Sequence, residues 1–466
     1  MKRPALGNLI ASARRIAPLA WPVFVGQIAV LAFSTVDTLF ASRASALDLA
    51  AMAIGSAVYT TVFISFMGMV MAVAPIAGQL FGAGRHVEAG EQFHQALWLA
   101  LAASAIGCSI LLFPQPFLHL SHANAETSVK VRSYLAALAF ALPCVLLFTA
   151  FRGFNTAVSR PKIVMALQLG ALALKIPLSA GLVFGVEVGP LRVSAQGAVG
   201  CAVATAIAMA CQLAAALWLV RRSPFYARFE LHRRLRAPHR ASLAGLVRLG
   251  VPLGLSVAIE VTGFTFMAIF IARFGTTPVA GHQIALNLLS ILFMMPLAIG
   301  NAASTLVAQR IGAGDSADAS RIGWHAVVIG ALLATLVGST VFGLRLPVLR
   351  AYTSDAQVVA AALPLLAWLV VFHIADAVQI IAAFVLRAYR IATMPLLIYA
   401  FAIWGLGLGG GYMLAFDSLG VSPAGLRGAA GYWAAATVGL VVAGFGLCTL
   451  QYFALRRRAA RPLARS

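Results

Sequence analysis

The sequence contains few charged residues, and few of those are acidic. Only 10% of its 466 residues are Asp, Glu, Lys or Arg, while 61% are hydrophobic and the mean hydropathy is +0.93. Asp and Glu number 13, against 34 Lys and Arg. A soluble globular chain carries about 25% charged residues. The composition therefore excludes an ordinary soluble protein and indicates an integral membrane protein.

Several sequence motifs of enzymes are absent as well. The chain has no HExxH, no GxSxG and no P-loop, and its nine histidines are scattered. Its five cysteines lie within apolar runs without metal-ligand spacing, which favours small buried residues over a disulfide or a metal site. We therefore expect neither an enzyme nor an ATP-driven pump, and no cofactor.

What the sequence does contain is a series of long apolar runs. A bilayer core of about 30 Å needs roughly 20 apolar residues per helix. The first run follows basic residues, as in a signal peptide, but it lacks a clean cleavage site and reads as a retained span. Twelve spans are predicted, near 17–41, 50–81, 94–113, 132–151, 163–186, 196–220, 247–272, 279–309, 323–343, 357–386, 393–416 and 430–454.

The net charge of +21 is unevenly distributed between the loops. If the N-terminus is cytoplasmic, most Lys and Arg lie on the cytoplasmic side, with the largest group between residues 221 and 248. We therefore expect both termini in the cytoplasm. The basic excess should face anionic lipid headgroups rather than nucleic acid.

An internal repeat organises the chain. A shift of 230 positions aligns, among others, Pro22 with Pro252, Arg43 with Arg273, and Gln79 with Gln309. The pattern predicts an all-α membrane protein of twelve transmembrane helices in two six-helix lobes, related by a parallel repeat. The N-terminal lobe covers 1–220, a basic cytoplasmic linker 221–246, and the C-terminal lobe 247–466 with a basic tail. Two such bundles around a central cleft suit alternating access.

Three acids lie inside predicted spans: Asp37, Glu260 and Asp376. A charge at the centre of a membrane helix costs about 2.5–3.5 kcal/mol on insertion scales, so such residues usually face a polar cavity and mark an ion or proton pathway. The alternative for each is a structural carboxylate bonded to neighbouring hydroxyls or amides. Glu260 and Asp37 do not align in the repeat, so the two lobes should bind different ligands, or one ion differently.

Three segments, in order, resemble a known family. "WPVFVGQIAVLAFSTVDTLFAS", "AGHQIALNLLSILFMMPLAIGNAASTLVAQRIGAGD" and "DAVQIIAAFVLRAYR" are similar to the first, eighth and tenth helices of multidrug and toxic compound extrusion (MATE) transporters, especially the NorM-like branch. The resemblance implies a twelve-helix antiporter of a bacterial cytoplasmic membrane. It would export amphipathic, often cationic drugs while sodium ions or protons run inward. We treat it as a monomer.

The resemblance also suggests roles for single residues. Asp37 corresponds to the family's N-lobe acid, and Glu260 and Asp376 to its C-lobe cation-binding pair. Gln283 lies where the family has a polar residue in the cleft. An adaptable apolar surface in the same cleft would bind drugs, and its candidates, most of which should be plain packing residues, are Phe264, Phe266, Met267, Phe293, Met294 and Met295.

The sequence departs from the family at three positions. Lys175 and Ser179 replace asparagines expected near Asp37, and Phe372 replaces a tyrosine expected one turn before Asp376. If Lys175 pairs with Asp37, it repels sodium from that carboxylate. Coupling would then rest on the C-lobe pair, with Asp37 and Lys175 acting as a polar switch or gate. Alternatively, Lys175 extends to an interface and never meets Asp37.

Sodium and proton coupling both remain open from the sequence. Sodium requires several oxygen ligands, which two carboxylates, backbone carbonyls and hydroxyls such as Thr262 could supply. A proton requires only one acid, and a second carboxylate nearby favours its protonated form. The retention of both acids favours sodium.

A flippase for a lipid-linked saccharide or another lipid precursor is the alternative function. Such a protein should have a more cationic cavity, because it must hold pyrophosphate. Here the charges within the spans are three acids and one lysine. This balance favours a transporter of cations.

Overall fold

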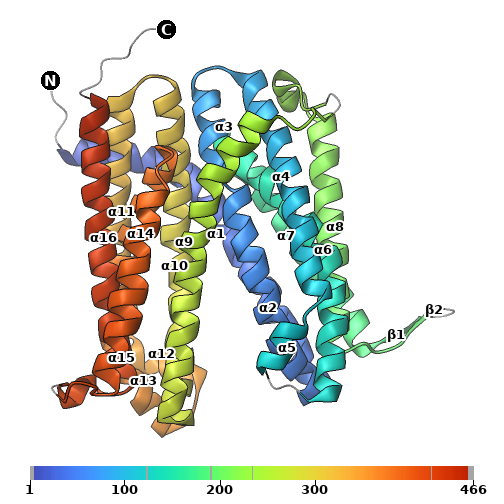
Figure 1. The fold of residues 1–466 in the computed structure, drawn as a ribbon, viewed down its shortest axis with the longest axis vertical. Helices are drawn as coiled ribbons and strands as arrows, with labels where there is room; N and C mark the ends of the chain where they lie inside the picture. Colours follow the sequence, from blue (N-terminus) through green and yellow to red (C-terminus); the bar gives the residue numbers. More distant parts are fainter. Residues whose placement is uncertain (1–4, 122–123, 189–190, 233–234, 421, 460–466) are drawn as a thin grey trace. The chain divides into compact units, whose positions relative to one another are not determined.

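The computed structural model describes residues 5–121, 124–188, 191–232, 235–420 and 422–459, and almost all of them are helical (Figure 1). In the first half of the chain the elements are α1 (Ala5–Ala44), α2 (Ala46–Val70), α3 (Val73–Gly82), α4 (His86–Leu112), α5 (Gln115–Ser121), α6 (Ala125–Ala157), α7 (Pro161–Phe184), β1 (Val186–Val188), β2 (Leu191–Val193), α8 (Ala198–Arg222) and η1 (Pro224–Phe229). In the second half they are α9 (Arg240–Ile271), η2 (Ala272–Phe274), α10 (Thr276–Gly312), α11 (Ser316–Gly343), α12 (Arg345–Tyr352), α13 (Ala356–Ala388), α14 (Thr393–Tyr399), η3 (Ala400–Gly409), α15 (Gly410–Ala415), η4 (Ala424–Leu426) and α16 (Ala429–Ala459).

Twelve helices among the described residues are long and apolar enough to cross a membrane, which confirms the predicted number of spans. Several extend beyond the predicted limits, because polar turns continue the helix at its ends. The first span, predicted from residue 17, extends back to Gly7 within α1. The eleventh, Thr393–Ala415, passes through α14, the π-helical η3 and α15.

Side-chain caps and glycines set the helix ends. Ser45 begins α2 by accepting a hydrogen bond from the Asp48 amide, and Asn124 begins α6 by accepting one from the Thr127 amide. Gly84 and Gly314 have φ angles of 74° and 79° in the turns after α3 and α10. Since glycine adopts such angles without strain, the motifs "FGAGR" and "IGAGD" form tight turns between helices.

One element was not predicted from the sequence. Between α7 and α8 the chain forms a two-stranded antiparallel hairpin, in which Val186 pairs with Val193 and Val188 with Leu191. Each strand has only three residues. Segments this short carry too little alternation of polar and apolar residues to stand out beside long apolar runs.

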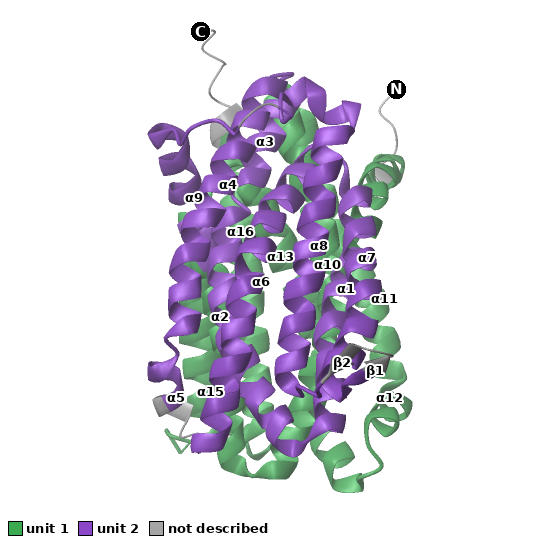
Figure 2. Ribbon diagram, turned by 90° about the vertical axis from the view of Figure 1, so that its right-hand side faces the viewer, with its two compact units in different colours: residues 1–24, 255–466 green, residues 25–254 purple. Residues whose placement is uncertain are grey.

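The helices form two compact units (Figure 2). Unit 1 contains residues 1–24 and 255–466, and unit 2 contains residues 25–254. These units differ from the predicted lobes in two segments, since the first part of α1 belongs to unit 1 and the first part of α9 to unit 2. The chain passes from one unit to the other after Phe24 and again after Gly254. These two positions are 230 residues apart, the same offset that aligns Pro22 with Pro252.

Specific contacts hold the first part of α1 in unit 1. Ile16 and Ala20 lie in a buried cluster together with residues of α10, α11, α13 and α16. Arg15 forms a salt bridge of 2.9 Å with Asp318 of α11, and the Ser12 hydroxyl lies 2.7 Å from Nδ1 of His325. Apolar packing and polar bonds therefore act on the same segment.

The first part of α9 is held in unit 2 by close approach of two backbones. A Cβ added at Gly250 would lie 2.5 Å from the Met69 carbonyl oxygen, and one at Gly254 would lie 2.6 Å from that of Ser65. On α2, a Cβ at Gly68 would meet the Gly254 Cα at 2.5 Å. Only glycine allows helices to pack this closely, as is common between membrane helices.

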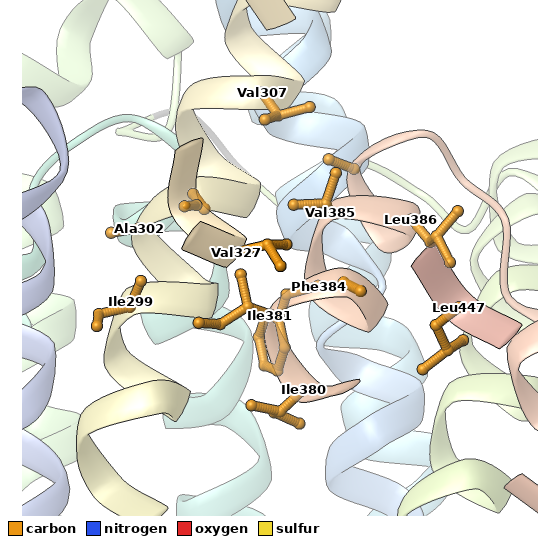
Figure 3. Close-up of a cluster of buried hydrophobic side chains, with 14 of the residues drawn as sticks. Ile299, Ala302, Val307, Val327, Ile380, Ile381, Phe384, Val385, Leu386 and Leu447 are labelled. Atoms are coloured by element: carbon orange, nitrogen blue, oxygen red, sulfur yellow. The ribbon is translucent and has the colours of Figure 1, made fainter. Parts of the chain in front are cut away.

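The largest core cluster of unit 1 joins α10, α11, α13 and α16. In Figure 3, Ile381 and Val385 of α13 lie beside Val327 of α11, and Leu386 of α13 lies beside Leu447 of α16. Between membrane helices the stabilisation comes from packing rather than from removal of water. The fully buried alanines of this cluster fit that requirement, because small side chains let helices approach.

The basic segment after α8 is anchored on unit 2 by aromatic residues. Tyr226 and Phe229 of η1 are buried, and the Tyr226 hydroxyl donates a hydrogen bond of 2.7 Å to Oδ1 of Asn155. Burial raises the pKa of Tyr226 to about 12, so it keeps this proton at physiological pH. The Arg228 guanidinium lies 4.1 Å from the centre of the Phe225 ring. Part of the predicted linker is therefore structured.

Candidate functional site

The three acids within spans occupy two separate clusters. Glu260 of α9 and Asp376 of α13 lie in unit 1, and Asp37 of α1 lies in unit 2. We call them the Glu260–Asp376 cluster and the Asp37–Lys175 pair.

A buried amide links the polar groups of the Glu260–Asp376 cluster. Gln379, one helical turn after Asp376, donates from Nε2 to Oδ1 of Asp376 at 3.0 Å. The Tyr399 hydroxyl of α14 donates to Oε1 of the same amide. Glu260 interacts with Gln379 and, electrostatically, with Asp376. Since Asp376, Gln379 and Tyr399 are at most 4% exposed, this arrangement is fixed inside the protein.

The charges of this cluster are unbalanced. Within the described part of the chain, neither Glu260 nor Asp376 forms a salt bridge with a Lys or Arg. Arg387 acts electrostatically on Tyr399, which interacts with both acids. Two buried carboxylates without a bonded counter-charge are costly. The cluster is therefore suited to bind a proton or a small cation with oxygen ligands.

Neighbouring groups bond to the backbone of α9 beside Glu260. The Thr262 hydroxyl donates to the Ala258 carbonyl at 2.5 Å, so this proposed ligand is engaged with its own helix. From η3, the Trp404 indole donates to the Ile259 carbonyl at 3.1 Å. The Trp404 bond holds the turn of α9 that carries Glu260 against η3.

Sequence reasoning did not identify Gln379 and Tyr399. The spacing of three residues from Asp376 places Gln379 on the same helix face, which was an available signal. Tyr399 lies on another helix, so only the fold brings it near. At the position where the family resemblance led us to expect a tyrosine, Phe372 packs against Trp433 with 5.4 Å between the ring centres.

In unit 2, Lys175 of α7 reaches Asp37. Its Nζ donates to Oδ2 of Asp37 at 2.7 Å and to the Thr205 hydroxyl at 2.5 Å. The Lys175 side chain is 1% exposed and that of Asp37 is 14% exposed. The interaction that the sequence left open is therefore present, and Lys175 does not extend to an interface.

The predicted cleft residues lie on α9 and α10. Phe264 and Met267 line a small cavity between α9, η3 and α16. On α10, Phe293 packs at the edge of the large core cluster, Met294 is half-buried, and Gln283 is exposed. Among these five, Phe264 and Met267 share this cavity.

The chain is similar to known proteins in both sequence and fold. The MatE family profile matches residues 22–180 and 252–413. A relative from Aromatoleum aromaticum, named "Probable multidrug resistance protein NorM", is 38% identical over 437 residues, 92% of each chain. The Pseudomonas aeruginosa protein named "Multidrug resistance protein PmpM" is 31% identical over 454 residues, covering 96% of this chain and 94% of its own.

Solved structures share the fold. The eukaryotic MATE transporter AtDTX14 has a TM-score of 0.85 at 18% identity, and the Vibrio cholerae MATE transporter VcmN in its bent form has a TM-score of 0.84 at 18% identity. Each comparison covers 97% of this chain and 98% of the other. With the family profile covering most of the chain and relatives above 30% identity aligning along it, this protein belongs to the MatE family.

Proposed function

We propose that the protein is a secondary active multidrug efflux transporter. It moves amphipathic or cationic drugs outward in exchange for inward sodium ions or protons, by alternating access. The family and the names of its relatives support drug export. The bacterial relatives support a bacterial cytoplasmic membrane, and the distribution of Lys and Arg supports both termini in the cytoplasm. We propose that it works as a monomer.

The Glu260–Asp376 cluster carries the coupling part of this proposal. Two carboxylates offer up to four oxygen atoms, and a buried amide bonded to Tyr399 orients one of them. With no Lys or Arg bonded to either acid among the described residues, an entering cation would not have to displace one. The presence of two acids rather than one favours sodium over a proton.

Asp37 is proposed to have another role. Its carboxylate already holds the Lys175 ammonium at 2.7 Å. An incoming cation would have to displace this ammonium, which is attached to the chain and therefore always present at high effective concentration. We propose that the Asp37–Lys175 pair is a polar switch that joins α1 to α7 and opens during the transport cycle.

Substitution Asp376→Asn tests the coupling site. In cells without other pumps, sodium-dependent efflux of a fluorescent lipophilic cation should fall to the background of cells without the protein, because the amide removes one cation-binding charge. Efflux is compared in sodium and choline buffers at fixed pH. Asp355→Asn is a matched control, since Asp355 is an exposed helix cap and asparagine caps equally well.

Three outcomes separate the alternatives. Equal wild-type efflux in both buffers, abolished by a protonophore, would identify protons as the coupling ion. Efflux that survives Asp376→Asn at the wild-type level would contradict coupling through this cluster. Absence of efflux from a well-expressed wild-type protein would contradict drug export and favour a lipid-linked substrate.

Substitution Asp37→Asn should leave ion dependence in place. We expect slower efflux that still requires the same cation, because the Glu260–Asp376 cluster is untouched. The measurement is the ratio of efflux in sodium to that in choline. Loss of transport in Asp37→Asn, with normal transport in Glu260→Gln and Asp376→Asn, would reverse the assignment.

A further inference from the structure

The surroundings of the Lys175 ammonium are those of a cation site. Two neighbouring helices supply its contacts: the Asp37 carboxylate comes from α1 and the Thr205 hydroxyl from α8. Thr205 donates its own proton to the Cys201 carbonyl at 2.9 Å, so its oxygen presents lone pairs to the ammonium. The face of Phe33 lies 4.8 Å from Nζ, which adds a cation–π contact.

Two further oxygens are buried here without a hydrogen-bond partner in the described structure. They are Oδ1 of Asp37 and Oγ of Ser179, which follows Lys175 by one helical turn. Ser179 is 0% exposed. Such unsatisfied acceptors are rare in protein interiors. At Asp37 itself, one buried carboxylate oxygen is therefore left that the single ammonium does not use.

Lys175 is also unusual for its burial. It is the only Lys or Arg among the buried polar residues of the described chain. A cation buried here without Asp37 would be strongly unfavourable. The carboxylate, the Thr205 hydroxyl and an aromatic face surround the ammonium, and oxygen ligands of this kind suit hard cations rather than transition metals.

We propose that the Lys175 ammonium is a tethered cation that fills a second monovalent-cation site at Asp37. The protein would then exchange cations only at the Glu260–Asp376 cluster, although each unit contains oxygen ligands for one. This inference rests on the proposed function, because it concerns how many cation sites take part in coupling. Removing the ammonium should uncover the second site.

Equilibrium binding of radioactive sodium to purified protein tests this proposal. The parent protein carries Glu260→Gln and Asp376→Asn, which remove the first site, and it should bind no sodium above background. Adding Lys175→Asn, whose amide oxygen can serve as a ligand, should restore stoichiometric sodium binding. Adding Asp37→Asn as well should abolish that binding, which assigns it to Asp37.

Two more variants distinguish the proposal from a purely structural role. Lys175→Arg keeps a tethered cation and should bind no sodium in the parent background. Lys175→Met, also in the parent background, removes the charge without adding a ligand, and this variant should be more thermally stable in sodium than in choline. The thermal-stability measurement also tests the proposal if Lys175→Asn folds poorly, because it requires only that part of the Lys175→Met protein is folded.

The proposal is overturned if neither variant gains sodium binding or sodium-dependent stability while size-exclusion chromatography shows folded protein. Sodium binding by the Lys175→Arg variant would overturn it as well. Failure of the proposed function would appear elsewhere, as wild-type efflux without any cation dependence while Lys175 is intact. The two hypotheses can therefore fail separately.

Discussion

Replacing Lys175 by methionine is expected to destabilise the protein by about 3–5 kcal/mol, the cost of breaking a buried ion pair by removing one partner. The ammonium bonds to Oδ2 of Asp37, and the other carboxylate oxygen already lacks a hydrogen-bond partner in the described structure. Without Lys175 the buried carboxylate loses its counter-ion and must either carry an uncompensated charge or take up a proton, and both cost free energy. Denaturant unfolding in detergent, without sodium, measures the change.

The double variant Asp37→Asn with Lys175→Met should recover most of that loss, because it removes both charges together. Lys162→Met provides a control on the same helix, since Lys162 is exposed at the start of α7 and its replacement should change stability by less than about 0.5 kcal/mol. A single Lys175→Met variant as stable as wild type would show that the pair contributes no net stability.

Replacing Asp48 by alanine should lower the free energy of unfolding by about 2–4 kcal/mol, because three hydrogen-bond donors lose their shared acceptor. The buried Asp48 carboxylate accepts hydrogen bonds from Lys130 at 2.8 Å, the Ala198 amide at 3.1 Å and Ser45 at 2.6 Å. It thereby joins the start of α2 to α6 and α8. A Cβ at Gly197 would lie 2.5 Å from this carboxylate, so glycine is needed beside it.

Two related variants separate the contributions. Asp48→Asn keeps the size and a hydrogen-bond acceptor, so it should cost less than Asp48→Ala. Lys130→Met should cost less still, because the Lys130 side chain is 34% exposed and water screens its charge. Thermal unfolding of the purified variants gives the order, and a larger loss for Lys130→Met than for Asp48→Ala would contradict the structural role of the carboxylate.

The number and positions of the spans followed from the sequence because lipid imposes a strong length requirement on apolar helices. Glycine also marks the "FGAGR" and "IGAGD" turns, since Gly84 and Gly314 adopt backbone angles that other residues avoid. The exchange of helix segments between units was not foreseen. It depends on which neighbours α1 and α9 meet, and hydropathy carries no information about neighbours.

Some of the functional residues could likewise be found from the sequence, and others could not. Asp37, Glu260 and Asp376 could be found because a charge within a span is rare. Lys175 could be found for the same reason, and its contact with Asp37 is present in the structure. Tyr399 could not be found, because aromatic residues are common in membrane helices and its bond to Gln379 exists only after the chain has folded. The apolar cleft residues gave no reliable signal, since packing and binding use the same side chains.

The exchange of segments in α1 and α9 has a consequence for biosynthesis. The ribosome makes residues 5–24 early, but the segments of α10, α11 and α13 against which Ile16 and Ala20 pack follow residue 255. The beginning of α1 must therefore remain without its final neighbours until the second half of the chain has inserted. A protein cut at residue 232 would give fragments with six spans each, yet each would lack a segment of its own unit. Such fragments could reach the native packing only together, by each donating part of a helix to the other.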